Sequence, residues 1–237
     1  MAHHDTTTIA GYAARWTRVA IDVSTGDGSR IPAEPIELYA LADAESAIDS
    51  AALLRERVID DPPYWALVWT GAVAMAAAAT QRVLPAGARV VDLGCGLGLA
   101  GLALARLGAR VTFGDYLPEP LTFVRATLER TAATNCQVRP LDFTDPADDG
   151  SRYDLILAAD IVYDPSHYAP LAAWLDTHLA PGGTILLTES LRADARVFLE
   201  GLCARGFEDR RQALWVMEDG RRERTWLHEI ARPSRRA

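Results

Sequence analysis

The stretch VVDLGCGLGLAG, residues 90–101, indicates a β-strand that runs through a glycine-rich turn into the start of a helix. Gly94, Gly96 and Gly98 lack a Cβ, so the backbone of the turn can take positive φ angles and pass close to a ligand. In open α/β sheets, ligands bind at the carboxyl ends of the strands, where such turns lie. The stretch therefore predicts a cofactor site; the alternative is a tight turn that caps a helix without a ligand.

Strand patterns and helix patterns alternate along the rest of the chain, which is typical of a parallel sheet with helices on both faces. The segment 206–231 carries two strand patterns around Asp219-Gly220, and this pair predicts a tight antiparallel turn. We therefore expect an α/β, Rossmann-like, seven-stranded, mostly parallel sheet that ends in a C-terminal antiparallel hairpin. The other predicted strands are residues 89–93, 110–115, 137–142, 153–160 and 183–189, and the predicted helices are residues 66–83, 99–107, 119–134, 167–179 and 194–205.

The first 60 residues have a different pattern. Residues 17–23 and 36–41 are typical of strands, and the turn-rich segment GDGSRIPAEP lies between them, so we expect an N-terminal β-hairpin. Residues 43–58 indicate a capped helix. We interpret these 60 residues as an extension made of a hairpin and a helix, and residues 61–237 as the main domain.

The composition limits the class of protein. The chain has 237 residues, of which 49% are apolar and 24% are charged, as is ordinary for a soluble globular protein. No apolar run is long enough to span a membrane, and the first residues do not form a signal peptide. Three cysteines are too few for a disulfide framework, so we expect a cytoplasmic protein. The formal net charge of −8 argues against nucleic-acid binding, and the histidines lack the spacing of metal ligands.

Acidic residues at the ends of strands favour S-adenosylmethionine (SAM) over a dinucleotide. Residues 96–101 match the dinucleotide pattern G-x-G-x-x-G, but alone this match is weak. Asp92 precedes the glycines, where an anion would repel a pyrophosphate but suits the ammonium group of a methionine moiety, directly or through water. Asp115 ends the next strand and can accept hydrogen bonds from both ribose hydroxyls, as also occurs in nicotinamide sites. Asp142 can accept from the adenine amino group and Phe143 can stack on the ring; the alternative is a loop aspartate beside a core phenylalanine.

Four short motifs together resemble the class I, seven-β-strand SAM-dependent methyltransferases. They are VDLGCGLG (91–98), GDY (114–116), LDF (141–143) and DLILAADIVYD (154–164). Three further features resemble the seven-β-strand protein lysine methyltransferases: the acid-x-x-aromatic motif from Asp160 to Tyr163, the segment PYWALVWTG (63–71), and the N-terminal hairpin. The resemblance implies that SAM is the cofactor and S-adenosylhomocysteine the product. It also implies that Trp69, Tyr116 and Ala159 contribute to the cofactor site.

Asp160 and Tyr163 are the candidate catalytic residues. A carboxylate at the edge of the sheet can orient a substrate ammonium group, and a tyrosine can wall the channel and attract a cation through its π face. Alternatively, Asp160 caps the next turn and Tyr163 belongs to the core. We expect N-methylation of a lysine in a protein substrate. The alternatives are a small-molecule amine, with residues 43–65 as a lid, and a SAM-binding scaffold without catalysis.

The segment DDPPYW, residues 60–65, contains the Asp-Pro-Pro-Tyr signature of DNA amino-methyltransferases. In a permuted enzyme of that class, a long target-recognition region would separate the signature from the glycine-rich turn. Only about 30 residues lie between Asp61 and Asp92, which is too few for such a module. We therefore interpret the segment as a helix break and an entrance element, in which the prolines direct the chain towards Trp69.

Overall fold

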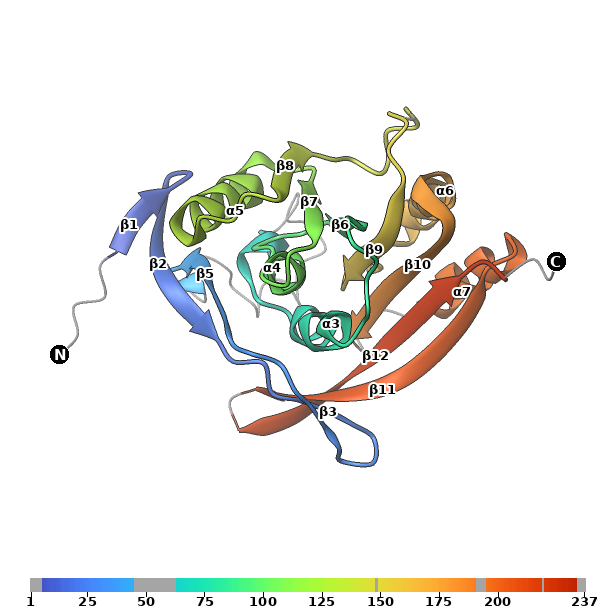
Figure 1. Cartoon of the computed structure of the whole chain (residues 1–237), viewed down its shortest axis with the longest axis horizontal. Helices are drawn as coiled ribbons and strands as arrows, with labels where there is room; N and C mark the ends of the chain where they lie inside the picture. Colours follow the sequence, from blue (N-terminus) through green and yellow to red (C-terminus); the bar gives the residue numbers. More distant parts are fainter. Residues whose placement is uncertain (1–5, 45–62, 148, 191–194, 219, 234–237) are drawn as a thin grey trace.

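The main sheet of the computed structural model contains nine strands among the described residues, which are 6–44, 63–147, 149–190, 195–218 and 220–233 (Figure 1). Seven of them stand in the predicted arrangement, and two N-terminal strands extend one edge. The order is β4 (Arg30–Ile31), β3 (Val23–Thr25), β11 (Glu208–Glu218), β12 (Arg221–Ala231), β10 (Leu179–Ser190), β9 (Tyr153–Ala159), β6 (Arg89–Leu93), β7 (Arg110–Asp115) and β8 (Cys136–Pro140).

The strands from β10 to β8 are parallel, and β12 and β11 close the sheet as an antiparallel hairpin. Successive residues of a strand face opposite sides of the sheet, so Val90 and Val91 belong to different hydrophobic clusters. The cluster of Val90 contains residues of α3 (Thr70–Thr80), α4 (Leu99–Ala105) and α5 (Pro118–Thr131), and that of Val91 contains residues of α6 (Tyr168–His178) and α7 (Arg196–Ala204). The helices therefore cover both faces, which confirms the predicted α/β class.

The N-terminal strands form two structures. Three of them, β1 (Thr6–Ile9), β2 (Tyr12–Val19) and β5 (Ile36–Leu41), make a separate antiparallel sheet beside α5 (Figure 1). The backbone N–H of Tyr39 donates to Oγ1 of Thr127 in α5 over 3.0 Å. The remaining strands β3 and β4 lie between β2 and β5 in sequence but pair with each other and with β11 of the main sheet.

Three of the sequence-based boundaries are wrong. The strand predicted for residues 183–189 is longer, because β10 begins at Leu179. Residues 17–23 are not one strand, because β2 ends at Val19 and the chain then crosses to the main sheet, where β3 begins at Val23. The helix predicted for residues 66–83 is shorter, because residues 64–66 form a 3-10 turn and α3 begins only at Thr70. The helix predicted for residues 43–58 lies almost wholly outside the described residues, as does the start of the DDPPYW segment.

Alanine dominates α3, which packs against α4 and against β10, β11 and β12 of the main sheet. Ala74, Ala77 and Ala79 are completely buried, because their small side chains allow close approach of the neighbouring elements. No helix within the described ranges is long and apolar enough to cross a membrane.

Candidate functional site

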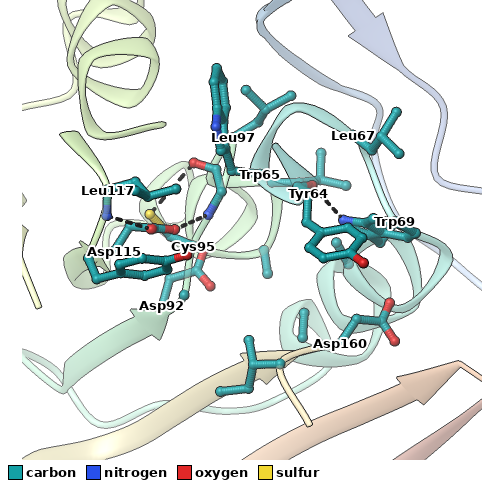
Figure 2. Close-up of a pocket in the computed structure, with 18 of the residues that line it drawn as sticks. Tyr64, Trp65, Leu67, Trp69, Asp92, Cys95, Leu97, Asp115, Leu117 and Asp160 are labelled. Atoms are coloured by element: carbon teal, nitrogen blue, oxygen red, sulfur yellow. Dashed lines mark hydrogen bonds between the residues drawn. The ribbon is translucent and has the colours of Figure 1, made fainter. Parts of the chain in front are cut away.

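A cavity of about 480 Å³ opens at the carboxyl ends of the parallel strands (Figure 2). Its walls come from the turns that follow β6, β7 and β9 and from residues 64–69 before α3. The volume lies in the range of small-molecule sites, about 300–1,000 Å³. Most of the predicted site residues line the cavity: Trp69, Asp92, Gly94, Gly96, Asp115, Tyr116, Asp142, Phe143, Ala159, Asp160 and Tyr163.

The glycine-rich turn uses its glycines in two ways. Gly96 lines the cavity with a φ of 50°, and a Cβ there would lie 3.2 Å from the carbonyl oxygen of Trp65. Gly98, with a φ of 79°, is the N-cap of α4 and does not line the cavity. A Cβ at Gly98 would lie 3.0 Å from Val124 and 3.1 Å from Phe113. Gly98 therefore has a packing role, and its predicted contact with the cofactor stays a prediction.

Asp115 ends β7 with its carboxylate fixed on both sides. Its Oδ2 accepts from the backbone N–H of Gly96 over 3.0 Å, and its Oδ1 accepts from that of Leu117 over 3.1 Å (Figure 2). The side chain is buried but lines the cavity. These bonds connect the turns after β6 and β7 and give the carboxylate one orientation. A carboxylate in one fixed orientation can accept hydrogen bonds from two ribose hydroxyls at once. The contact of Asp115 with the ribose stays a prediction.

Asp92 lies deeper in the same wall. Its Oδ2 accepts from the N–H of Gly101 in the first turn of α4 over 2.8 Å, where the helix dipole favours a negative charge. The carboxyl group is 2% exposed. Burial raises the pKa of Asp92 to about 7, the bond from Gly101 opposes the shift, and the nearby charge of Asp115 adds to it. A cation in the cavity would therefore stabilise the ionised form of Asp92.

Asp142 and Phe143 lie beyond β8 at the far side of the cavity. Oδ1 of Asp142 accepts from both the backbone N–H and the hydroxyl of Thr144, over 2.8 and 2.6 Å, which closes a tight turn. The Phe143 ring meets the ring of His167 edge to face, with 5.5 Å between the centroids. Asp142 and Phe143, the two predicted adenine contacts, thus both line the cavity. Asp142 also stabilises its loop, as the alternative of a structural loop aspartate expected.

Asp160 holds together two elements that are distant in sequence. Its Oδ2 accepts from the N–H of Gly71 in the first turn of α3 over 2.9 Å, and its Oδ1 accepts from the N–H of Ser190 at the end of β10 over 2.7 Å. The residue has a positive φ of 53°. A Cβ at Gly71 would lie 2.3 Å from Oδ2, so glycine is required at this contact. Asp160 therefore does cap a helix, but one that begins 90 residues earlier in the chain rather than the next turn.

Aromatic rings form the entrance of the cavity. The ring of Tyr64 lies 5.9 Å from Trp69 and 5.5 Å from Tyr163, centroid to centroid. Nε1 of Trp69 donates to the carbonyl oxygen of Tyr64 over 2.8 Å, which fixes the indole (Figure 2). Tyr163 is 45% exposed, so it is not a core residue. The entrance can therefore hold the apolar stem and the cationic end of a lysine.

Sequence reasoning missed His167, which also lines the cavity. Its Nδ1 is buried and has no hydrogen-bond partner within the described ranges. Its ring lies 6.3 Å from that of Tyr163. In the sequence, the pair Asp164-Pro165, which favours a turn, is the signal that the chain bends back there and brings His167 to the cavity. No group of three potential metal ligands occurs in the part of the chain that is described.

The comparison with known proteins agrees with this geometry. A family described as lysine methyltransferase matches residues 63–203. Protein N-lysine methyltransferase METTL21A of Danio rerio is 36% identical over 129 residues, which are 52% of this chain and 58% of that protein. Ubiquinone biosynthesis O-methyltransferase of Methylobacterium sp. (strain 4-46) is 38% identical over 101 residues, which are 41% of this chain and 39% of that protein.

Solved structures show the same fold. A glycopeptide N-methyltransferase complexed with SAM superposes with a TM-score of 0.56 and 18% identity, covering 69% of this chain and 94% of that one. The chain spans less than two thirds of the length of the two curated relatives above. The family match, however, covers more than half of the chain and includes the glycine-rich turn, the strand-end carboxylates and the aromatic entrance. The chain therefore belongs to the lysine methyltransferase family.

Proposed function

We propose that this protein transfers a methyl group from SAM to the side-chain amine of a lysine in another protein. The observation that carries the proposal is the aromatic entrance formed by Tyr64, Trp69 and Tyr163 above the carboxylate-lined cavity. A narrow aromatic channel suits a long, unbranched side chain with a compact cationic end, which describes the ammonium of lysine better than the wider, planar guanidinium of arginine.

The cavity residues fit the cofactor. Asp115 presents an oriented carboxylate for the ribose, and Asp92 is a buried carboxyl group beside the turn that can pair with the ammonium of the methionine moiety. Phe143 and Asp142 offer a ring and an acceptor for the adenine. When bound, the cofactor supplies an electrophilic methyl group on a sulfonium.

The residues of the aromatic entrance favour the neutral form of the acceptor, the lysine amine. A lysine in water has a pKa of about 10.4, but only its neutral form can attack a methyl group. Partial removal from water beside the rings of Tyr64 and Tyr163 disfavours the charged form of the lysine amine, and its proton leaves to solvent. The π faces then stabilise the methylated ammonium that forms. Asp160 acts by position, because its bonds to Gly71 and Ser190 fix α3, and hence Trp69, against the end of β9.

The test is a labelling reaction with radioactive methyl-SAM in a cell lysate. The chain contains no lysine, so labelled methyl-lysine cannot come from the untagged protein itself. We expect one or a few labelled protein bands that yield methyl-lysine after acid hydrolysis, and loss of the label with Asp115→Ala. Label found only in low-molecular-weight material would instead support a small-molecule acceptor. The similarity to an O-methyltransferase of ubiquinone biosynthesis favours this second candidate.

A further inference from the structure

The terminal hairpin extends past the edge of the sheet that carries the cavity. Thr225 pairs with Ser190, the last residue of β10, so the preceding residues of β12 and their partners in β11 project further. At the tip, the hydroxyl of Thr70 donates to Oε2 of Glu218 over 2.9 Å. Thr70 follows Trp69, which lines the entrance. The hairpin, seen in Figure 1 as the long ribbon beside α3, therefore lies next to the opening of the cavity.

One side of this hairpin, which we call the hairpin face, combines arginine with large apolar side chains. Strand alternation and the pairing of Trp215 with Arg224 and of Met217 with Arg222 put its members on the same side. The opposite side carries Leu214 and is buried against the core. The members of the hairpin face are Arg211, Trp215, Met217, Arg222, Arg224 and Trp226.

The arginines of the hairpin face are stacked on its tryptophans. The guanidinium carbon lies 4.5 Å from the ring centroid for Arg222 over Trp215, and 4.9 and 5.4 Å for Arg211 and Arg224 over Trp226. All three arginines are exposed. Nη2 of Arg222 also donates to Oγ of Ser24 over 3.5 Å. Stacking leaves the other guanidinium N–H groups free to meet an acceptor and holds each group in place, so little side-chain entropy is lost on binding.

The positive charge of the hairpin face is not compensated within the described residues. None of the three arginines forms a salt bridge with a carboxylate there. Two acids on the same side of the sheet, Asp209 and Glu189, instead contact the buried ring of His228, over 2.9 and 3.5 Å. Because His228 engages both acids, neither of them forms an ion pair with these arginines. Glu218 and Glu223 of the same hairpin alternate to its opposite side, where Glu218 contacts Thr70, and the whole chain has a formal net charge of −8.

We infer that the hairpin face docks an acidic segment of the protein substrate while the nearby acceptor lysine enters the aromatic channel. This inference rests on the proposed function and adds a substrate class, namely proteins whose target lysine lies close to Asp or Glu residues. Carboxylates bind guanidinium groups through paired, charge-assisted hydrogen bonds, and the exposed Met217 and the tryptophans offer apolar contact. A phosphate backbone is a poorer match, because three arginines on a protein of this net charge release few counterions.

The test compares two fluorescent 12-residue peptides with one central lysine. One has flanking Glu and Leu residues, and the other has Gln in place of every Glu. By fluorescence anisotropy, we expect the Glu peptide to bind about tenfold more tightly than the Gln peptide at low salt. The double variant Arg222→Gln/Arg224→Gln should remove this difference. The control variant Arg110→Gln removes an exposed arginine at the start of β7, the end of that strand away from the cavity. It should leave the preference for the Glu peptide unchanged.

Equal binding of the two peptides, or an unchanged preference in the double variant, would overturn the inference. So would tighter binding of a single-stranded oligonucleotide that depends on the same arginines, since it would identify a nucleic-acid surface. Arg211→Gln, at the other end of the hairpin face, repeats the comparison if the double variant does not fold. The peptide assay needs no methyl transfer, so the two hypotheses can fail separately. If methyl-lysine is labelled in the lysate but the two peptides bind equally, only the docking inference is rejected. If no lysine is labelled, the proposed function is rejected.

Discussion

Asp115 and Asp160 are both carboxylates at strand ends, but they serve different partners. Asp115 faces the predicted ribose position, whereas both oxygens of Asp160 accept from the backbone. We predict that Asp115→Ala weakens SAM binding by about a hundredfold or more, because it removes two hydrogen bonds to a charged group, each of which contributes about 1.5–3 kcal/mol. Asp160→Asn should change the affinity much less and lower turnover instead. Isothermal calorimetry with both variants checks this, and equal losses of affinity would contradict the assignment.

Asp92 should make cofactor binding depend on pH. Burial raises the pKa of its carboxyl group to about 7, and an ammonium group binds the ionised form better. We therefore predict that SAM affinity decreases as the pH falls from about 7 to 5.5, because Asp92 becomes neutral, and also above about pH 8, where an α-ammonium group loses its proton. Asp92→Asn should bind SAM more weakly and lose the dependence between pH 5.5 and 7. If the variant keeps the wild-type pH profile, another group is responsible.

At the scale of elements, His228 couples three strands of the main sheet. It lies on β12 between Asp209 of β11 and Glu189 of β10. Burial lowers the pKa of His228, but the hydrogen bonds and charges of the two acids outweigh it and raise the pKa to about 9. Because this value exceeds the unfolded value of about 6.5, the protonated histidine stabilises the fold fully below pH 6.5, and the contribution is lost as the pH rises to 9.

We therefore predict that the free energy of unfolding decreases between pH 6.5 and 9 by on the order of 3 kcal/mol more in the wild type than in His228→Gln. Urea unfolding at several pH values measures this. His178→Gln, at a second buried histidine, is compared in the same way, because the Nδ1 of His178 contacts a backbone carbonyl and its Nε2 lies 3.7 Å from a single carboxylate, that of Asp149, whereas His228 lies between two acids. Parallel pH curves for the wild type and His228→Gln would show that the histidine is neutral in the folded protein.

Elements with local signals could be predicted from the sequence. The glycine-rich turn, Asp115 at the end of its strand and the hairpin around Gly220 each follow from a few neighbouring residues. The pairing of β3 with β11 could not be predicted, since no local pattern encodes a partner some 190 residues away. The same holds for the bonds from Asp160 to Gly71 and Ser190. Such contacts depend on how the elements pack, which hydrophobic periodicity does not specify.

At the scale of the whole molecule, the predicted division at residue 60 can be tested by truncation. In the structure, β3 covers the edge of β11, and Ile36, Leu38 and Leu41 of β5 are buried. We predict that residues 61–237 alone are less stable than the full chain and self-associate, because an open strand edge and new apolar surface are exposed. Thermal unfolding and size-exclusion chromatography measure this. An equally stable monomer would support two independent domains.

The double contact of Asp160 has a consequence for the order in which the molecule folds. The carboxylate joins α3, which is made early in synthesis, to β10, which is made late, and β10 in turn pairs with β12 near the end of the chain. Contacts between residues so distant in sequence form slowly, because the entropy cost of closing a long loop precedes the energy that the contacts contribute. The bonds of Asp160 that hold α3 at the entrance can therefore be completed only after β10 has been synthesised, so a nascent chain that stops before Ser190 lacks this support.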